Sequence, residues 1–255
     1  MIPPLAKDAD TAPRAGLFGL LRRNGWALLL AAGLTILVHM AIYAAASAMA
    51  SPASAVATLL GSLLWIVVAA PMFAAGGRSL LEGLLRGAAV IDAGIVVLVV
   101  LAAGNDSVGP LGAVKVYLVW CAVALAGCAA AQQARRVRTR HVLAAVAVAA
   151  VVLISAGPFW ANGMIHAAQG PWRDRSVLAV TASNPVYATV ACLGDTRFVW
   201  HEMPLLYEFT VLDRDVPIKL CPWYPTAGGY AAVALLLMLR ARLARRRRAN
   251  SPAAR

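Results

Sequence analysis

Long apolar runs separated by short polar segments dominate the pattern along this chain. A transmembrane helix needs roughly 20 mainly apolar residues to cross about 30 Å of hydrocarbon. Six runs qualify, at residues 26–49, 53–75, 88–103, 111–131, 141–157 and 224–239, and the third and sixth of these are short. The pattern predicts an all-α polytopic membrane protein with six transmembrane helices and one long loop, residues 158–223, between the last two.

The composition agrees with this prediction. Hydrophobic residues make up 61% of the chain and charged residues 13%, and the mean hydropathy is +0.74. A soluble globular domain averages about 45–50% apolar and about 25% charged residues. These values exclude a soluble globular domain and, because so much of the chain is apolar, intrinsic disorder. Four cysteines in 255 residues also exclude a disulfide-dense scaffold.

Basic residues predict the orientation of the chain. With the N-terminus in the cytoplasm, 17 of the 23 Lys and Arg fall in the cytoplasmic segments 1–25, 76–87, 132–140 and 240–255. The two short outer turns, residues 50–52 and 104–110, contain none. Cytoplasmic loops carry an excess of Lys and Arg. We therefore expect a multi-pass protein of a bacterial-type inner membrane with both termini in the cytoplasm, and the net charge of +12 is mainly a signal of topology.

The runs divide the chain into five parts: a cytoplasmic segment 1–25, the first five spans in 26–157, an outer loop 158–223, the sixth span in 224–240 and a basic cytoplasmic tail 241–255. Residues 15–23 form either an interfacial amphipathic helix or the start of a long first helix. Ala48, Met49 and Ala50 look like a signal-peptidase site. Because the preceding run is longer than a signal peptide's 7–15 residues, the prediction is a retained first span.

The inner loop between the second and third runs has the pattern of a short helix. Ser79 and Glu82 have the spacing of a capping box. Leu80, Leu81, Leu84 and Leu85 then form an apolar stripe, and glycines stand at both ends. We expect a short cytoplasmic helix here, which either docks a partner or merely turns the chain.

The outer loop is expected to be folded or pressed onto the membrane. It holds four of the seven Trp and three of the five Phe, whereas disordered linkers lack aromatic residues. Asn184 followed by Pro185 is a helix-start signal and predicts a helix over 185–193. A second element is predicted at 198–212. Since amphipathic aromatic side chains favour the headgroup level, we expect these pieces to lie in or re-enter the outer interface.

Several residues in or near this loop are candidates for specific chemistry. Cys192 and Cys221 could form a disulfide in an oxidising compartment, while Cys121 and Cys128 are expected to be small packing residues. A metal site could draw on acids and histidines of the loop, namely His166, Asp195, His201, Glu202 and Glu208. Their spacing selects no metal, so we predict neither a metal nor another cofactor. His39 is expected to be a packed histidine.

The remaining ionisable residues do not indicate a catalytic group. Asp92 and Lys115 lie within spans, each about one turn from a predicted helix end, where snorkelling explains them. The Gly-x-Ser-x-Gly, Walker A and dinucleotide-binding motifs are absent from the sequence. Membrane lipid is the expected partner of the basic run in the tail, which consists of Arg245, Arg246, Arg247 and Arg248. No aromatic residue is interleaved there, so nucleic acid is not expected as a partner.

This layout resembles the permease subunits of ATP-binding-cassette (ABC) type-2 exporters. Those subunits are similar in length and have six spans with both termini inside. They also have an amphipathic helix before the first span, a short coupling helix in the second-to-third loop, and a large outer loop with re-entrant helices before the sixth. Residues 15–23, 78–86 and 158–223 occupy those three places here.

The resemblance implies a homodimeric exporter driven by a separate ATPase subunit. The coupling helix would then centre on four residues, Leu81, Glu82, Leu84 and Leu85. An alternative is a non-catalytic accessory or scaffold subunit of a membrane complex that binds its partners through the outer loop. A membrane-embedded enzyme is a third possibility, for which no catalytic residue is apparent.

Overall fold

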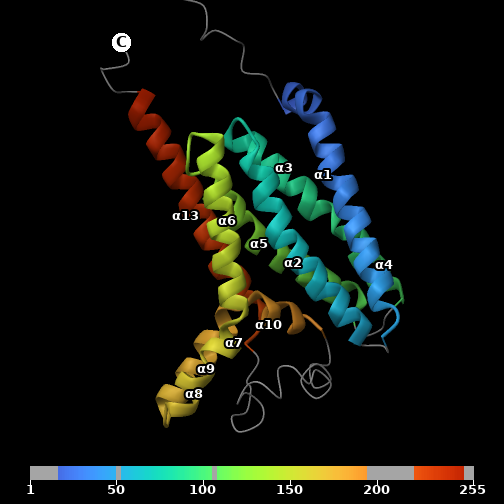
Figure 1. The fold of residues 1–255 in the computed structure, drawn as a ribbon, viewed down its shortest axis with the longest axis vertical. Coiled ribbons are helices and arrows are strands. Elements are labelled where there is room, and N and C mark those ends of the chain that lie inside the picture. The colour runs from blue at the N-terminus through green and yellow to red at the C-terminus, as the bar shows by residue number, and fades with distance from the viewer. Residues whose placement is uncertain (1–16, 50–52, 105–107, 194–220, 250–255) are drawn as a thin grey trace, which may run out of the picture.

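The computed structural model describes residues 17–49, 53–104, 108–193 and 221–249, and its regular structure there is entirely helical. The helices are α1 (Leu17–Ala46), α2 (Ala53–Ala75), α3 (Leu80–Ala93), α4 (Ile95–Gly104), α5 (Gly109–Ala131), α6 (Val137–Ser155), α7 (Gly157–Trp160), α8 (Asn162–Ala167), α9 (Pro171–Ser183), α10 (Pro185–Val190) and α13 (Trp223–Ala249). They form a bundle with a smaller helical group, α7 to α10, at one end (Figure 1).

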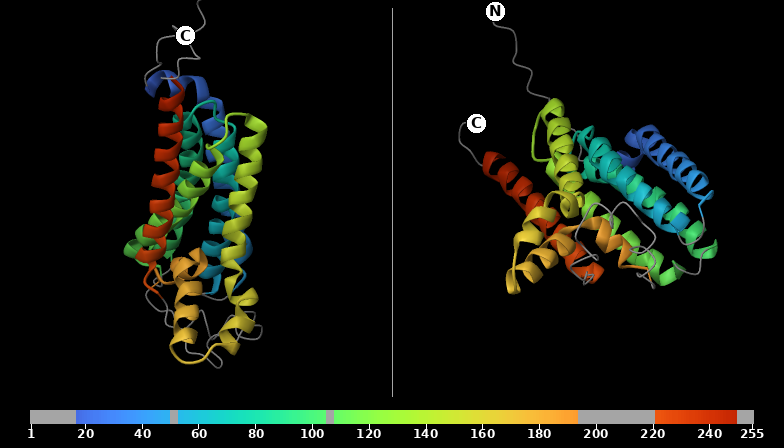
Figure 2. Two further views of the ribbon diagram at one scale, coloured as in Figure 1. Left: turned by 90° about the vertical axis from the view of Figure 1, so that its left-hand side faces the viewer. Right: turned by 60° about the horizontal axis from the view of Figure 1, so that its bottom comes forward.

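Five single helices and the consecutive pair α3 and α4 are each long and apolar enough to cross a membrane, which confirms the six predicted spans. Their bounds are Asn24–Ala46, Ala53–Ala75, Leu80–Gly104, Gly109–Ala131, Val137–Ser155 and Trp223–Ala244. The chain is therefore an integral polytopic membrane protein. The spans run up and down, so that the start of α1 and the end of α13 lie at the same end of the bundle (Figures 1 and 2).

The centre of the bundle is α5, which packs against α2, α3, α4, α6 and α13. Small residues allow these helices to approach closely, as is common between membrane helices. A Cβ atom added to Gly127 of α5 would lie 2.6 Å from Cγ of Pro71 in α2, and one added to Gly87 of α3 would lie 2.5 Å from Sγ of Cys128. By contrast α1, α6 and α13 lie at the periphery and expose large apolar side chains such as Leu37, which is suited to lipid.

The third span begins earlier than the sequence predicts. The separate short helix expected before it is wrong, because α3 begins at Leu80 and continues into the bundle to Ala93, where Gly94 separates it from α4. The predicted capping interaction is confirmed, since the Glu82 backbone N–H donates to Ser79 Oγ at 3.1 Å. Of the two alternatives for residues 15–23, the structure shows a continuous first helix from Leu17 to Ala46.

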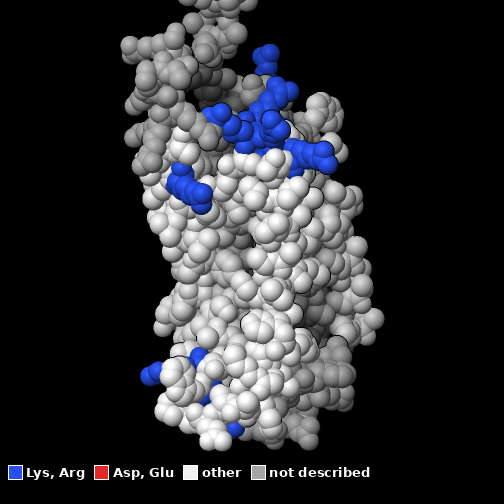
Figure 3. Space-filling view, turned by 60° about the vertical axis from the view of Figure 1, so that its left-hand side comes forward, with Lys and Arg blue, Asp and Glu red and all other residues white. Residues whose placement is uncertain are grey.

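Arginines concentrate at one end of the bundle, which we call the arginine-rich end. They come from the α2–α3 connection, the α5–α6 connection and the last turns of α13. In Figure 3 the blue side chains gather at this end, and a wide uncharged belt separates them from the few at the opposite end. The opposite end carries α7 to α10 (Figure 1). The grouping agrees with the predicted distribution of charge, and the side of the membrane that each end faces stays a prediction.

Candidate functional site

The four residues proposed for a coupling helix lie in the first two turns of α3, at the arginine-rich end. Leu81 is 49% exposed, whereas Leu84 and Leu85 are half-buried and Leu84 packs against the core of the bundle. Glu82 is only 1% exposed. Of the four, Leu81 thus has the most exposed side chain.

Glu82 instead helps to join α3 to α1. Its Oε1 accepts a hydrogen bond from Arg86 Nη2 at 2.8 Å, within one helical turn. The same nitrogen donates to Oδ1 of Asn24 in α1, also at 2.8 Å. A buried charge is tolerated when it is paired and hydrogen-bonded. This pairing explains how a carboxylate can stand inside the bundle without interrupting the third span.

A second carboxylate lies in the middle of the third span. Asp92 stands midway along Leu80–Gly104, its side chain is exposed on the surface of the bundle, and its Oδ1 accepts a hydrogen bond from the Tyr117 hydroxyl at 2.6 Å. The prediction that Asp92 lies one turn from the end of its span is wrong, because the span begins at Leu80, eight residues earlier than expected. Asp92 does lie one residue from the end of α3, next to the break at Gly94. An ionisable group within a span is a functional candidate by default.

A cluster of polar side chains is buried where α1, α2 and α5 meet. His39 is 1% exposed, and its ring stacks on that of Trp120 with centroids 6.2 Å apart. Within the described part of the chain, both ring nitrogens of His39, Nε1 of Trp120 and Oγ of Ser62 have no hydrogen-bond partner. Buried polar groups are normally satisfied, so these atoms are exceptions among the described residues. The expectation of a packed His39 is confirmed.

At the opposite end, α10 lies across the end of the bundle and packs onto it (Figure 1). Oδ1 of Asn184 accepts from the Val186 backbone N–H at 2.9 Å, and its Nδ2 donates to the carbonyl of Ser155 at 2.9 Å. This confirms the helix start predicted at Asn184 and Pro185, although the helix ends at Val190. Because α10 packs against α2, α5 and α13, it belongs to the packed end of the bundle and is not a surface loop, and its re-entry into the membrane stays a prediction.

The chain just after α10 carries one of the two cysteines proposed to form a disulfide. Cys192 is buried, and its Sγ donates to the carbonyl of Ala188 at 3.1 Å. Burial raises the pKa of the Cys192 thiol to about 12. Cys221 is half-buried, and both thiols are free in this structure. The disulfide between them stays a prediction.

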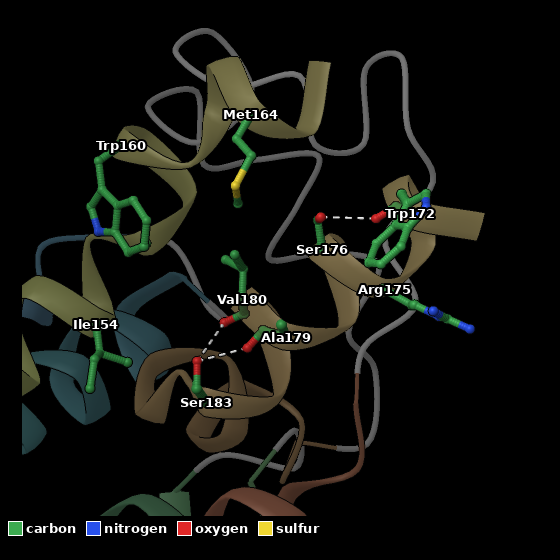
Figure 4. Close-up of a pocket in the computed structure, with 10 residues that line it drawn as sticks. Ile154, Trp160, Met164, Trp172, Arg175, Ser176, Ala179, Val180 and Ser183 are labelled. Atoms are coloured by element: carbon green, nitrogen blue, oxygen red, sulfur yellow. Dashed lines mark hydrogen bonds between the residues drawn. The ribbon is translucent and has the colours of Figure 1, made fainter. Parts of the chain in front are cut away.

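A pocket of about 380 Å³ lies between the end of α6 and the helices α7, α8 and α9, and we call it the aromatic pocket. Figure 4 shows Trp160, Met164 and Val180 around its hollow, while Arg175 points away from it. The hydroxyls of Ser176 and Ser183 are already bonded to carbonyls of their own helix. The walls are therefore apolar, and the pocket suits a hydrocarbon group better than a polar substrate.

Several predictions fall outside the described residues. These are the element at 198–212, four of the five candidate metal ligands (Asp195, His201, Glu202 and Glu208) and the side chains of Arg245, Arg246, Arg247 and Arg248, which lie in the last turns of α13. Among residues that are described, no three His, Cys, Asp or Glu gather as a metal site would require.

Sequence reasoning missed Tyr117 and Trp120, the partners of Asp92 and His39. Both interrupt an otherwise apolar run with a ring that carries a hydrogen-bonding group. Such a ring within a span needs a polar neighbour when it is buried, which is the signal that could have singled out α5.

Comparisons with known proteins give no relative for this arrangement: no protein-family model matches the chain, and neither a curated protein nor a solved structure matches it.

Proposed function

We propose that this integral membrane protein is the membrane-spanning permease subunit of an ABC type-2 exporter, worked by a separate ATPase. The observation that carries the proposal is the helical segment between the fifth and sixth spans. It leaves the bundle as α7 to α9 and returns to pack α10 against α2, α5 and α13. The exporter layout has short re-entrant helices in the same place in the chain.

The proposal places the ATPase at the arginine-rich end, which would face the cytoplasm. Leu81 is exposed in the first turn of α3 and stands beside the short α2–α3 connection, where a coupling helix is found in such exporters. The chain contains no phosphate-binding loop of its own. ATP hydrolysis is therefore assigned to another chain.

Purification from the native membrane in mild detergent tests the proposal. We expect an ATPase to copurify in stoichiometric amount with the wild-type protein and to be lost from the Leu81→Asp variant. Leu178→Asp is the matched control, because Leu178 is similarly exposed but lies in α9 at the opposite end. Other membrane subunits without an ATPase would contradict the proposal and support an accessory role.

The Asp92–Tyr117 pair favours one other function, ion-coupled transport without an ATPase. A carboxylate midway through a span is the kind of group on which proton relays depend. The two functions differ in their need for Asp92. If the chain couples transport to protons, Asp92→Asn abolishes proton flux in proteoliposomes, measured with an enclosed pH-sensitive dye. An ATP-driven permease keeps its ATPase stimulation in the same variant.

A further inference from the structure

A cavity of about 450 Å³ opens at the arginine-rich end, and we call it the arginine pocket. Its charged lining is entirely basic and consists of Arg78, Arg135, Arg140 and Arg240. Among the described residues that line it, none is Asp or Glu. We propose that the arginine pocket binds the phosphate-bearing headgroup of an anionic membrane lipid. This site is distinct from the basic run of the tail and is independent of the proposed function.

The walls of the pocket are fixed by side chains bonded to backbone carbonyls. Nε2 of Gln132 donates to the carbonyl of Ala74 at 2.5 Å, and Nε2 of Gln133 donates to that of Leu237 at 2.8 Å. These two amides tie the end of α5 to α2 and to α13. A pocket whose walls are already held loses less ordering entropy when a ligand binds.

Arg140 also holds the walls of the pocket through hydrogen bonds to backbone carbonyls. It is 5% exposed, its Nε donates to the carbonyl of Ala134 at 2.9 Å, and its Nη1 donates to the carbonyl of Gly77. The guanidinium thereby joins the α5–α6 connection to the α2–α3 connection. It also contributes a buried positive charge to the floor of the pocket.

Three further arginines reach the pocket from three different segments and are exposed: Arg78 from the α2–α3 connection, Arg135 from the α5–α6 connection and Arg240 from α13. None of them forms an ion pair with a described residue. Like charges gathered at one cavity repel one another, and an anion between them removes that repulsion. Phosphate suits this set because guanidinium groups bind its oxygens in a bidentate manner.

The level of the pocket in the bundle indicates a lipid as the source of the phosphate. The fourth span ends at Ala131, the fifth begins at Val137 and the sixth ends at Ala244, so the pocket lies where three spans leave the hydrocarbon. In Figure 3 the basic side chains border the uncharged belt at this level. Basic pockets between spans at this depth are suited to anionic headgroups.

The test is a titration of the purified full-length protein with phosphatidylglycerol, followed by native mass spectrometry, with phosphatidylcholine as the neutral lipid. The variant Arg78→Gln/Arg135→Gln/Arg240→Gln removes three charges from the pocket. The control, Arg136→Gln/Arg138→Gln/Arg242→Gln, removes three charges from exposed arginines of the α5–α6 connection, α6 and α13 that do not line it. We expect the pocket variant to bind phosphatidylglycerol about a hundredfold more weakly, at roughly fivefold per basic residue, and the control to lose about twofold or less.

Equal loss in the two triple variants would overturn the proposal, because it would show a diffuse attraction to the whole arginine-rich end. Displacement of the lipid by millimolar inorganic phosphate would overturn the assignment to a lipid in favour of a soluble phosphate compound. If the triple variant of the pocket arginines does not elute as a single species in gel filtration, the single variant Arg240→Gln is compared with the single variant Arg242→Gln. A roughly fivefold difference between these two supports the pocket, and no difference overturns it.

Discussion

The two ends of the molecule are built in opposite ways. At the arginine-rich end the helices are closely packed, and a Cβ atom added to Gly83 would collide with the side-chain amide of Gln132. At the opposite end Gly163 has no atom within 4 Å of the same position, and Trp172 is 69% exposed. The contrast is thus between the α3–α5 contact, held by buried polar groups, and the helices α7 to α9, which extend beyond the packed α10 and expose apolar side chains. An exposed apolar surface of this kind suits lipid or an apolar ligand.

The largest expected effect is a difference in thiol reactivity between Cys192 and Cys221. Cys192 is buried at the opposite end of the bundle, whereas Cys221 is half-buried. The thiolate is the reactive form, so a pKa of about 12 leaves Cys192 about a thousandfold less thiolate at pH 8 than an ordinary thiol of pKa about 8.5 has. With Cys121 and Cys128 changed to Ser, we expect maleimide to label Cys221 and to spare Cys192. Labelling of Cys192 should rise about tenfold per pH unit, since the raised pKa is approached from below.

The same experiment gives two further results. A maleimide that cannot cross membranes should label Cys221 in intact cells if the opposite end faces outward. Labelling that occurs only after reduction would show that Cys192 and Cys221 form the predicted disulfide. Rapid labelling of Cys192 at pH 8 would contradict the burial of the segment that follows α10.

Adding one methyl group, by a Gly→Ala substitution, should lower the stability of the protein much more at the arginine-rich end than at the opposite end. Gly83→Ala forces Gln132 out of its hydrogen bond with the carbonyl of Ala74 and overpacks the α3–α5 contact, at a cost of about 3 kcal/mol. Gly163→Ala meets open space and should change stability by about 0.5 kcal/mol or less. The apparent Tm in detergent, followed by tryptophan fluorescence, measures both. Similar losses in the two variants would contradict the contrast between the ends.

Arg140 offers a second test of the fixed end. Arg140→Leu leaves the carbonyls of Gly77 and Ala134 without this donor, and we expect a loss of about 2 kcal/mol. Arg138→Leu removes the same charge from an exposed position of the same helix and should lower stability by less than about 0.5 kcal/mol. Thermal unfolding of the two purified variants gives the comparison, and equal stabilities would mean that Arg140 does not hold the connections together.

The smallest effect on stability is expected at the Asp92–Tyr117 pair, which lies midway between the two ends of the bundle. Tyr117→Phe removes one hydrogen bond at an exposed position, which is worth about 1 kcal/mol. Asp92→Asn keeps an acceptor for the Tyr117 hydroxyl and should cost less. A loss well above about 1 kcal/mol in the Phe variant would show that the pair is structural, and would weaken ion-coupled transport as a function.

The apolar pattern predicts most of the fold because span length is fixed by the membrane. The run at 53–75 is observed as Ala53–Ala75 without change. The third span was the exception, since Gly83, Glu82 and Arg86 have the pattern of a polar, glycine-rich loop. In the structure the glycine allows close packing and the two charges neutralise each other, so all three residues belong to the helix. Moving the helix start to Leu80 is what brings Asp92 to the middle of the third span.

The candidate sites were less predictable because they depend on which spans become neighbours. Local signals at Ser79 and Asn184 fix two helix starts, and both are confirmed. By contrast Asp92 meets Tyr117, and His39 meets Trp120, only through the packing of α1, α3 and α5. Nothing in the spacing of these residues along the chain indicates which pairs form. The same holds for the arginine pocket, whose side chains come from three separate segments.

Site-specific photo-crosslinking from position 81 in the native membrane is the most direct measurement of the proposed arrangement. A benzophenone side chain replaces Leu81 in one variant and Leu178, at the opposite end, in the other. If the arginine-rich end is the platform of an exporter subunit, position 81 gives an adduct with an ATPase and position 178 does not. An adduct at position 81 with a protein that binds no nucleotide, or an ATPase adduct at position 178, would contradict the proposal.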